Sequence, residues 1–168
     1  MQQRVISFIV SNQPGVLCRI AGLISRRGFN IDSLTVGVTS DPALSRMTIV
    51  MSADDAVIEQ VIKQLDKQLD VKAIKEIPQD QGTLREIALV KVNMSGIDRT
   101  DFMKEVSERG GIVLDIGQTT ATVQFTGTIA FINECVDMLR KYGIVEVART
   151  GMVALERGDT RLIDCGQL

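Results

Sequence analysis

Histidine and tryptophan are absent from this 168-residue chain, and tyrosine occurs once. Without histidine the chain cannot form a Ser-His-Asp or Cys-His catalytic arrangement, and it lacks the commonest metal ligand. Few aromatic side chains leave little surface for stacking nucleic-acid bases. The net charge of −2 provides no basic surface for nucleic acid or anionic lipid. The composition therefore argues against common hydrolases, nucleic-acid binders and membrane-surface proteins.

The three cysteines Cys18, Cys135 and Cys165 are far apart and form no C-x-x-C pair, so a zinc site is not predicted. Cys18 and Cys135 lie on apolar helix faces, and both are predicted to be buried. No apolar run approaches the roughly 20 residues that span a bilayer, and no targeting segment precedes the first strand pattern. We therefore expect a soluble, cytoplasmic protein that keeps its thiols reduced.

The first half of the chain alternates β-branched runs with apolar residues at helical spacing. The predicted strands cover residues 5–10, 31–38, 45–51 and 71–77, and helices lie within 16–27 and 54–65. Gly28 ends the first helix, and Asp54 and Asp55 are interpreted as dipole-stabilising residues at the start of the second rather than as a metal or acid pair. The order is βαββαβ, followed by a polar linker at 78–83.

The same order returns in the second half. Strands are predicted at 86–94, 112–116, 120–126 and 144–148, and helices around 102–106 and 129–139. Residues 151–156 either extend the last strand or add an edge strand. We predict an α+β protein of two ferredoxin-like domains, 1–78 and 84–158, followed by a polar, loosely held tail at 159–168.

Each predicted domain is small, and a domain of about 75 residues buries only about 60% of its chain surface. Exposed sheet edges also invite pairing with another chain. A homodimer that joins sheets or packs helices is therefore expected. Ferredoxin-like domains serve as enzymes, RNA binders and ligand sensors, so a site must decide the function.

The best candidate site is the first strand-to-helix connection, residues 12–17. A helix N-terminus presents free N–H groups and partial positive charge to a carboxylate. Gly15 allows close approach to the backbone, Asn12 offers a donor and an acceptor, and Val16 and Leu17 supply an apolar wall. The alternative is an ordinary Pro-Gly turn in which Asn12 caps the helix.

A second candidate is the segment 27–32, which includes Asn30 and Ile31. It begins like an RNA-binding RNP1 motif, but no second aromatic residue follows Phe29. The alternative is a glycine at a helix end with Phe29 in the core. In the predicted topology the strand-helix crossings bring Asn30 near the first loop, so Asn30 is kept as a candidate.

Several segments together resemble the regulatory, or small, subunit of acetohydroxyacid synthase (acetolactate synthase), a family with ACT domains. The first segments are NQPGVL at 12–17, RRGFNIDSLTVG at 26–37, DP at 41–42 and LSRMTI at 44–49. The others are REIALVKV at 85–92, YGIVEVARTG at 142–151, AL at 154–155 and RG at 157–158. The resemblance spans roughly residues 4 to 158. Cys18 stands where relatives often have serine or alanine.

This resemblance implies an ACT domain followed by a distinct ferredoxin-like domain, in a homodimeric regulatory subunit without catalytic residues. Such a subunit activates a large catalytic subunit and confers feedback inhibition by valine or a related branched-chain amino acid, in valine and isoleucine biosynthesis. It implies no cofactor or metal on this chain, and thiamine diphosphate, Mg²⁺ and FAD on the catalytic partner. The implied effector-binding residues are Asn12, Gly15, Val16 and Leu17, with Asn30 and Ile31 of the facing protomer.

Two other function classes stay open at this point. One is a free-standing ACT-type amino-acid sensor or transcriptional regulator, which the resemblance over both halves disfavours. The other is an enzyme on the same fold, such as an acylphosphatase. That activity needs an arginine cradle for phosphate in the first loop, and no arginine occurs there before Arg19.

Overall fold

The computed structural model describes residues 2–165, which form two compact units. The first unit contains the chain up to Leu84 together with the chain from Met152 onward, and the second contains Arg85–Gly151. The elements of the first unit are β1 (Gln2–Ser11), α1 (Val16–Ser25), β2 (Ser33–Val38), β3 (Leu44–Ala53), α2 (Asp55–Asp66), β4 (Val71–Glu76), β9 (Val153–Glu156) and the 3-10 turn η2 (Leu162–Cys165). Strand β5 (Gly82–Asn93) begins in the first unit and continues into the second.

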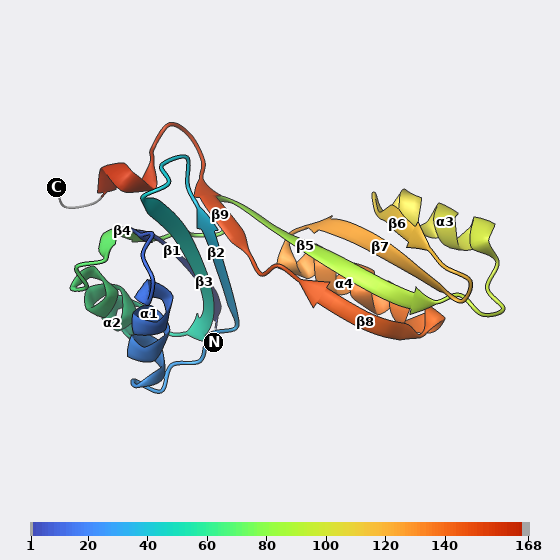
Figure 1. Ribbon diagram of the computed structural model, residues 1–168, viewed down its shortest axis with the longest axis horizontal. Coiled ribbons are helices and arrows are strands. Elements are labelled where there is room, and N and C mark those ends of the chain that lie inside the picture. Colours follow the sequence, from blue (N-terminus) through green and yellow to red (C-terminus); the bar gives the residue numbers. More distant parts are fainter. Residues whose placement is uncertain (1, 166–168) are drawn as a thin grey trace. The chain divides into compact units, whose positions relative to one another are not determined.

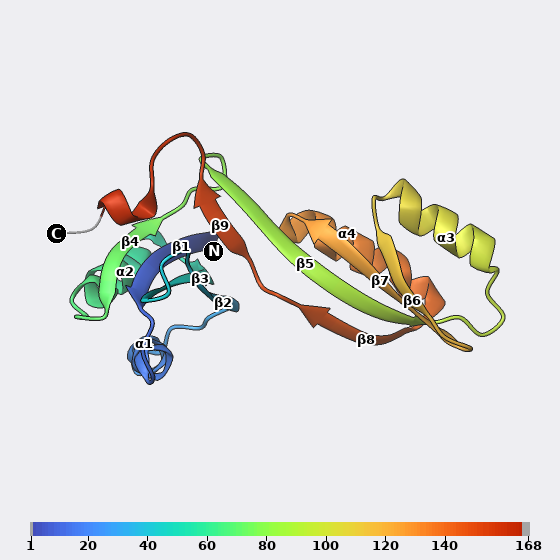
Figure 2. The ribbon, with the colours of Figure 1, turned by 45° about the horizontal axis from the view of Figure 1, so that its top comes forward.

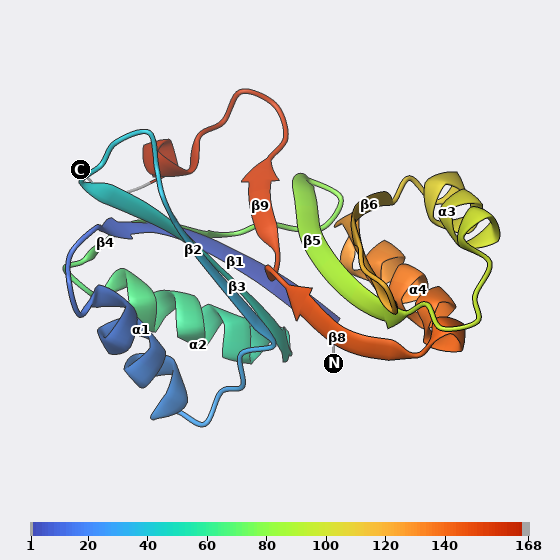
Figure 3. The same cartoon turned by 45° about the vertical axis from the view of Figure 1, so that its right-hand side comes forward.

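The first unit is built on an antiparallel sheet in the order β2-β3-β1-β4. Helices α1 and α2 cover one face of this sheet (Figures 1 and 3). Alternate residues of β1 point into that layer, where Ile6, Phe8 and Val10 pack against the helices. The period-2 pattern of the strands and the 3.6-residue pattern of the helices meet in this core, which fixes the βαββαβ arrangement.

The opposite face of the first sheet is also buried. Val5 and Val50 pair across β1 and β3 on this face and are almost fully inaccessible. Residues 152–165, which we call the return segment, supply β9 and η2 on this side (Figure 3). Leu162 of η2 packs against Ile9 and Ala73, so the first sheet is sandwiched between its two helices and the returning chain.

The second unit repeats the layout with the elements α3 (Arg99–Glu108), β6 (Ile112–Ile116), β7 (Thr120–Gly127), α4 (Ile129–Leu139), η1 (Arg140–Tyr142) and β8 (Ile144–Arg149). Its sheet has the order β6-β7-β5-β8, and β9 also pairs with β5 (Figure 2). Strand β5 alternates strictly, so that Ala88, Val90 and Val92 join Phe102 and Ile132 in the core. The predicted α+β class with two ferredoxin-like βαββαβ domains is confirmed.

The structure departs from the sequence analysis at two places. Cys135 is buried as predicted, but the prediction for Cys18 is wrong because its side chain is exposed. Val16, Ile20 and Ile24 occupy the core face of α1, and Cys18, two positions after Val16, lies about 200° around the helix from Val16 and so on the opposite side. Of the tail expected at 159–168, residues 166–168 lie outside the described residues. In the described part Leu162 is buried and η2 forms, which the sequence did not predict because one leucine among polar residues gives no periodic signal. No helix within residues 2–165 is long and apolar enough to cross a membrane.

Candidate functional site

The loop of residues 12–17 is fastened to the turn between β2 and β3. The Asn12 side-chain amide donates to the Pro42 carbonyl at 2.9 Å, and the Asn12 backbone N–H donates to the Ala43 carbonyl at 2.7 Å. Asn12 therefore does not cap α1, contrary to the alternative interpretation of this loop. The N-cap of α1 is Gly15, whose φ of 84° lies in the left-handed region that glycine occupies without strain.

The start of α1 differs from the starts of the other α-helices in the described chain. A side-chain oxygen accepts from first-turn N–H groups in α2, α3 and α4, where the caps are Asp54, Asp98 and Thr128. No side chain caps α1. The Val16 N–H donates to the Gln13 carbonyl at 3.3 Å, and the next N–H groups carry the partial positive charge of the helix end. This end of α1 is therefore suited to a carboxylate.

The apolar residues of the loop are divided between the core and the surface. Val16 is buried in the core of the first unit, so its side chain supports the loop from below. Leu17 is 44% exposed and is the apolar side chain that this loop offers to a ligand or a partner. A Cβ at Gly15 would approach the Arg19 guanidinium at 3.0 Å, and Arg19 is held by Asp70 at 2.8 Å.

Asn30 and Ile31 lie beyond the other end of α1. The Asn30 side-chain amide donates to the Asp32 carboxylate at 3.0 Å and is exposed, while Ile31 packs partly against the core. The 10 residues of α1 span about 15 Å at 1.5 Å per residue. Within one chain the structure therefore separates Asn30 and Ile31 from Gly15 by the length of a helix, contrary to the expectation that the topology brings Asn30 near the first loop.

Strand β2 forms an edge of the first sheet between these two groups of residues. The predicted site residues lie at its two ends. Asn30 and Ile31 precede its start at Ser33, and the turn that binds Asn12 follows its end at Val38. Val36 and Val38 are 44% and 62% exposed on this strand. A free edge strand with apolar side chains is a surface that favours pairing with another strand.

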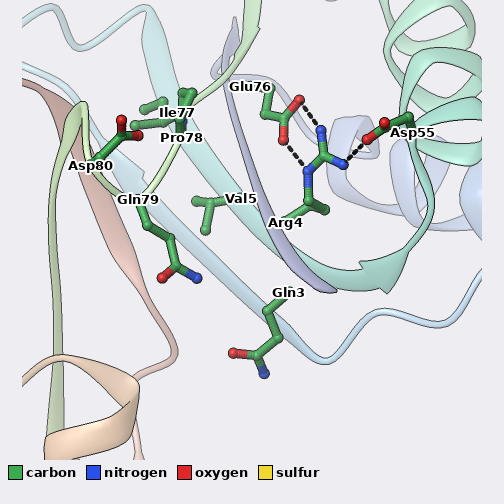
Figure 4. A pocket seen from close by; sticks show the side chains of 9 residues that line it. All are labelled: Gln3, Arg4, Val5, Asp55, Glu76, Ile77, Pro78, Gln79 and Asp80. Carbon is green, nitrogen blue, oxygen red and sulfur yellow. Dashed lines mark hydrogen bonds and ion pairs between the residues drawn. The ribbon is translucent and has the colours of Figure 1, made fainter. Parts of the chain in front are cut away.

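In contrast to this apolar edge, a cavity of about 470 Å³ beside the start of β1 is lined mostly by polar side chains (Figure 4). Arg4 lies in it between the carboxylates of Glu76 and Asp55 and is paired with both, with Nη2 at 2.9 Å from Glu76 Oε2. These two carboxylates raise the pKa of Arg4 further. Because each guanidinium nitrogen of Arg4 is bonded to a carboxylate of its own chain, this cluster stabilises the end of the sheet.

Both halves of the chain match families of known proteins. Residues 6–73 match the model of the AHAS small subunit-like ACT domain, and residues 85–158 match that of the small subunit of acetolactate synthase. The chain is 44% identical to the acetolactate synthase isozyme 3 small subunit of Salmonella typhimurium, over 94% of this chain and 97% of that protein. It is 40% identical to the acetolactate synthase small subunit of Mycolicibacterium smegmatis, over 91% of this chain and 90% of that one.

A solved structure agrees with these matches. The crystal structure of the acetolactate synthase small subunit from Thermotoga maritima superposes with a TM-score of 0.87 at 34% identity, over 95% of this chain and 100% of that chain. The second family model ends at residue 158, whereas spatially the chain from Met152 onward groups with the first unit.

Proposed function

We propose the function of this chain from its family, since the chain belongs to the small subunits of acetolactate synthase. It acts as a regulatory subunit that activates a large catalytic subunit and transmits feedback inhibition by valine or a related branched-chain amino acid. Thiamine diphosphate, Mg²⁺ and FAD belong to the catalytic partner, and this chain contributes no catalytic residue. The protein works in the cytoplasm, in the biosynthesis of valine and isoleucine.

The observation that carries this proposal is the placement of the candidate residues at the two ends of β2. In a homodimer with two-fold symmetry whose β2 strands pair antiparallel, the start of one β2 faces the end of the other. Asn30 and Ile31 of one protomer then meet Asn12, Gly15 and Leu17 of its partner. The two groups that α1 holds apart within one chain become one site across the interface.

The chemistry of such a composite site suits an α-amino acid. The uncapped start of α1 attracts the carboxylate. The Asn12 and Asn30 side-chain oxygens accept hydrogen bonds from the ammonium group, since their amide nitrogens already donate to Pro42 and Asp32. Leu17 and the exposed valines of β2 provide an apolar surface for an aliphatic side chain. The effector thus bridges two protomers and responds to their relative position.

The test is a pair of variants at Gly15 in a reconstituted enzyme. Gly15→Asp and Gly15→Asn place side chains of nearly equal size in the same left-handed conformation, which Asn and Asp tolerate best after glycine. Only Asp adds a negative charge beside the effector carboxylate. We expect Gly15→Asp to raise the valine concentration for half-inhibition roughly tenfold to a hundredfold relative to Gly15→Asn, since like charges at a partly buried site cost about 1–3 kcal/mol.

Three measurements separate the outcomes for each variant: circular dichroism, stimulation of the large subunit, and the valine inhibition curve. Stimulation is expected to persist in both variants because Gly15 is exposed and lies outside the core. Equal valine inhibition in the two variants refutes the carboxylate site at α1. Loss of stimulation with intact folding in Gly15→Asp assigns the loop to subunit contact instead.

A further inference from the structure

A cavity of about 490 Å³ lies in the first unit, on the face of the sheet opposite to α1 and α2. The return segment forms one side of it, and β1, β3 and the loop between β2 and β3 form the other. Its apolar lining comes from Ile9, Leu44, Leu155, Leu162 and Ile163. This cavity is separate from the loop of residues 12–17, none of which lines it.

Two polar side chains of this cavity have unused hydrogen-bonding atoms. Arg46 of β3 and Glu156 of β9 both line it, and within the described residues Arg46 Nε and Glu156 Oε2 are buried without a hydrogen-bond partner. The Glu156 side chain is only 9% exposed, and its other oxygen is held by Lys75 at 2.6 Å. A buried donor and a buried acceptor that are both unpaired are unfavourable, so a bound group that satisfies both is favoured.

Burial also affects the pKa of Arg46. Desolvation lowers the pKa of Arg46, and the neighbouring Glu156 carboxylate opposes this effect. Arg161, the other arginine of the lining, is already held by Asp164 at 2.8 Å. Arg46 is therefore the lining cation that is left to bind a ligand.

We propose that this cavity is a second ligand site, which takes the zwitterion of a small aliphatic α-amino acid. The ligand carboxylate accepts from Arg46 Nε, its ammonium donates to Glu156 Oε2, and its side chain packs against Leu44, Leu155 and Leu162. The site goes beyond the proposed effector site because it lies within a single chain and on the other face of the sheet.

The charges of the lining select a zwitterion over a simple ion. The cavity wall carries Arg46 and Arg161 against Asp41, Glu156 and Asp159. A carboxylic acid without an amine leaves Glu156 Oε2 unpaired and adds repulsion, and an amine without a carboxylate leaves Arg46 Nε unpaired. An α-amino acid carries both groups on one carbon and so offers a partner to each of the two atoms.

The experiment uses calorimetric titration of the full chain carrying Gly15→Asp, which weakens binding at the proposed effector site roughly tenfold to a hundredfold. The probes are L-leucine, 4-methylpentanoate and 3-methylbutylamine, which carry both charged groups, the carboxylate only, and the amine only. We expect saturable binding of leucine alone. Arg46→Lys keeps the positive charge but removes Nε–H, and Glu156→Gln removes the negative charge. Each is expected to weaken leucine binding roughly tenfold to a hundredfold.

Lys75→Gln is the matched control, because it removes the ion pair with Glu156 and leaves Arg46 Nε and Glu156 Oε2 in place. It should retain leucine binding, and thermal unfolding checks that each variant is folded. The inference is overturned if leucine shows no saturable binding, as expected for a cavity that holds water only. It is also overturned if 4-methylpentanoate binds equally well, or if Arg46→Lys binds like the parent. Valine inhibition through Gly15 is measured separately, so either proposal can fail without the other.

Discussion

Mixed dimers offer the sharpest test of a site shared between two protomers. If Gly15 of one protomer and Asn30 of its partner build each site, then Gly15→Asp and Asn30→Ala homodimers both have two damaged sites. A mixed dimer instead collects both substitutions in one site and leaves the other intact. Two different affinity tags on the two variants allow the mixed dimer to be purified.

The expected recovery of valine binding in the mixed dimer follows from the geometry of the shared site. About half of the sites in a pure mixed dimer are intact, because two-fold symmetry pairs each loop with the other chain. A site within a single chain gives no recovery, since every chain of the mixed dimer carries a substitution. The roughly 15 Å length of α1 separates Gly15 from Asn30 in one chain, a span that one amino acid cannot bridge.

Calorimetry of valine binding distinguishes these cases. The mixed dimer should give a biphasic titration, with a tight phase of wild-type affinity from the intact sites. The second phase should be weaker by at least tenfold, since Asp adds like charge and Ala removes amide hydrogen bonds of about 1 kcal/mol or more. Gly15→Asp under both tags is the control. A mixed dimer that binds no more tightly than its two parents refutes the shared site.

Three further expectations follow from individual residues. A thiol reagent should label exposed Cys18 in the native protein but label Cys135 only after unfolding, because Cys135 is buried and burial raises its pKa; mass spectrometry locates the label. The hydrogen bond from Lys141 is the main cause that lowers the pKa of Glu105. This carboxylate therefore contributes stability above its unfolded pKa of about 4.3, and that stability is lost as the pH falls through the lower folded value. Glu105→Gln should therefore reduce the free energy of unfolding at pH 7 but make its decline in acid shallower, as measured by urea titrations at several pH values. Val38→Lys places a charge on the exposed edge strand β2 and should shift the protein to monomers in light scattering at micromolar concentration; an unchanged mass places the interface elsewhere.

The sequence allowed the fold to be predicted because each element carries a local signal. Alternation in β5 and helical spacing in α1 are strong patterns, and they repeat in the same order in both halves. The role of the return segment was not predictable in this way. Leu162 is buried by contact with Ile9 and Ala73, which are more than 80 residues away in the chain, and no local pattern encodes such a contact.

The candidate loop shows the same division between local and distant information. The Pro-Gly turn at the start of α1 was predicted, and Gly15 adopts the left-handed conformation there. The role of Asn12 was not predictable from its neighbours in sequence, because its side-chain amide donates to the Pro42 carbonyl in the β2–β3 turn and does not cap the helix. The sequence did not indicate a site at Arg46 and Glu156, because a lone charged residue on a strand is usually solvated. The two residues come together only because the return segment, which carries Glu156, folds back over β3.

The conformation of Gly15 and the open end of α1 have a common cause. A capping Ser, Thr or Asp normally adopts an extended backbone, as Asp54, Asp98 and Thr128 do at the other helices. The left-handed φ of Gly15 excludes that arrangement and forgoes a cap worth about 1 kcal/mol. Asn12, which stands close enough in sequence to serve as a cap, instead ties the loop to the turn that ends β2. The loop is thus held in place before any ligand arrives, and no side chain caps the first N–H groups of α1. A ligand bound there is mechanically connected to the edge strand on which the proposed dimer depends.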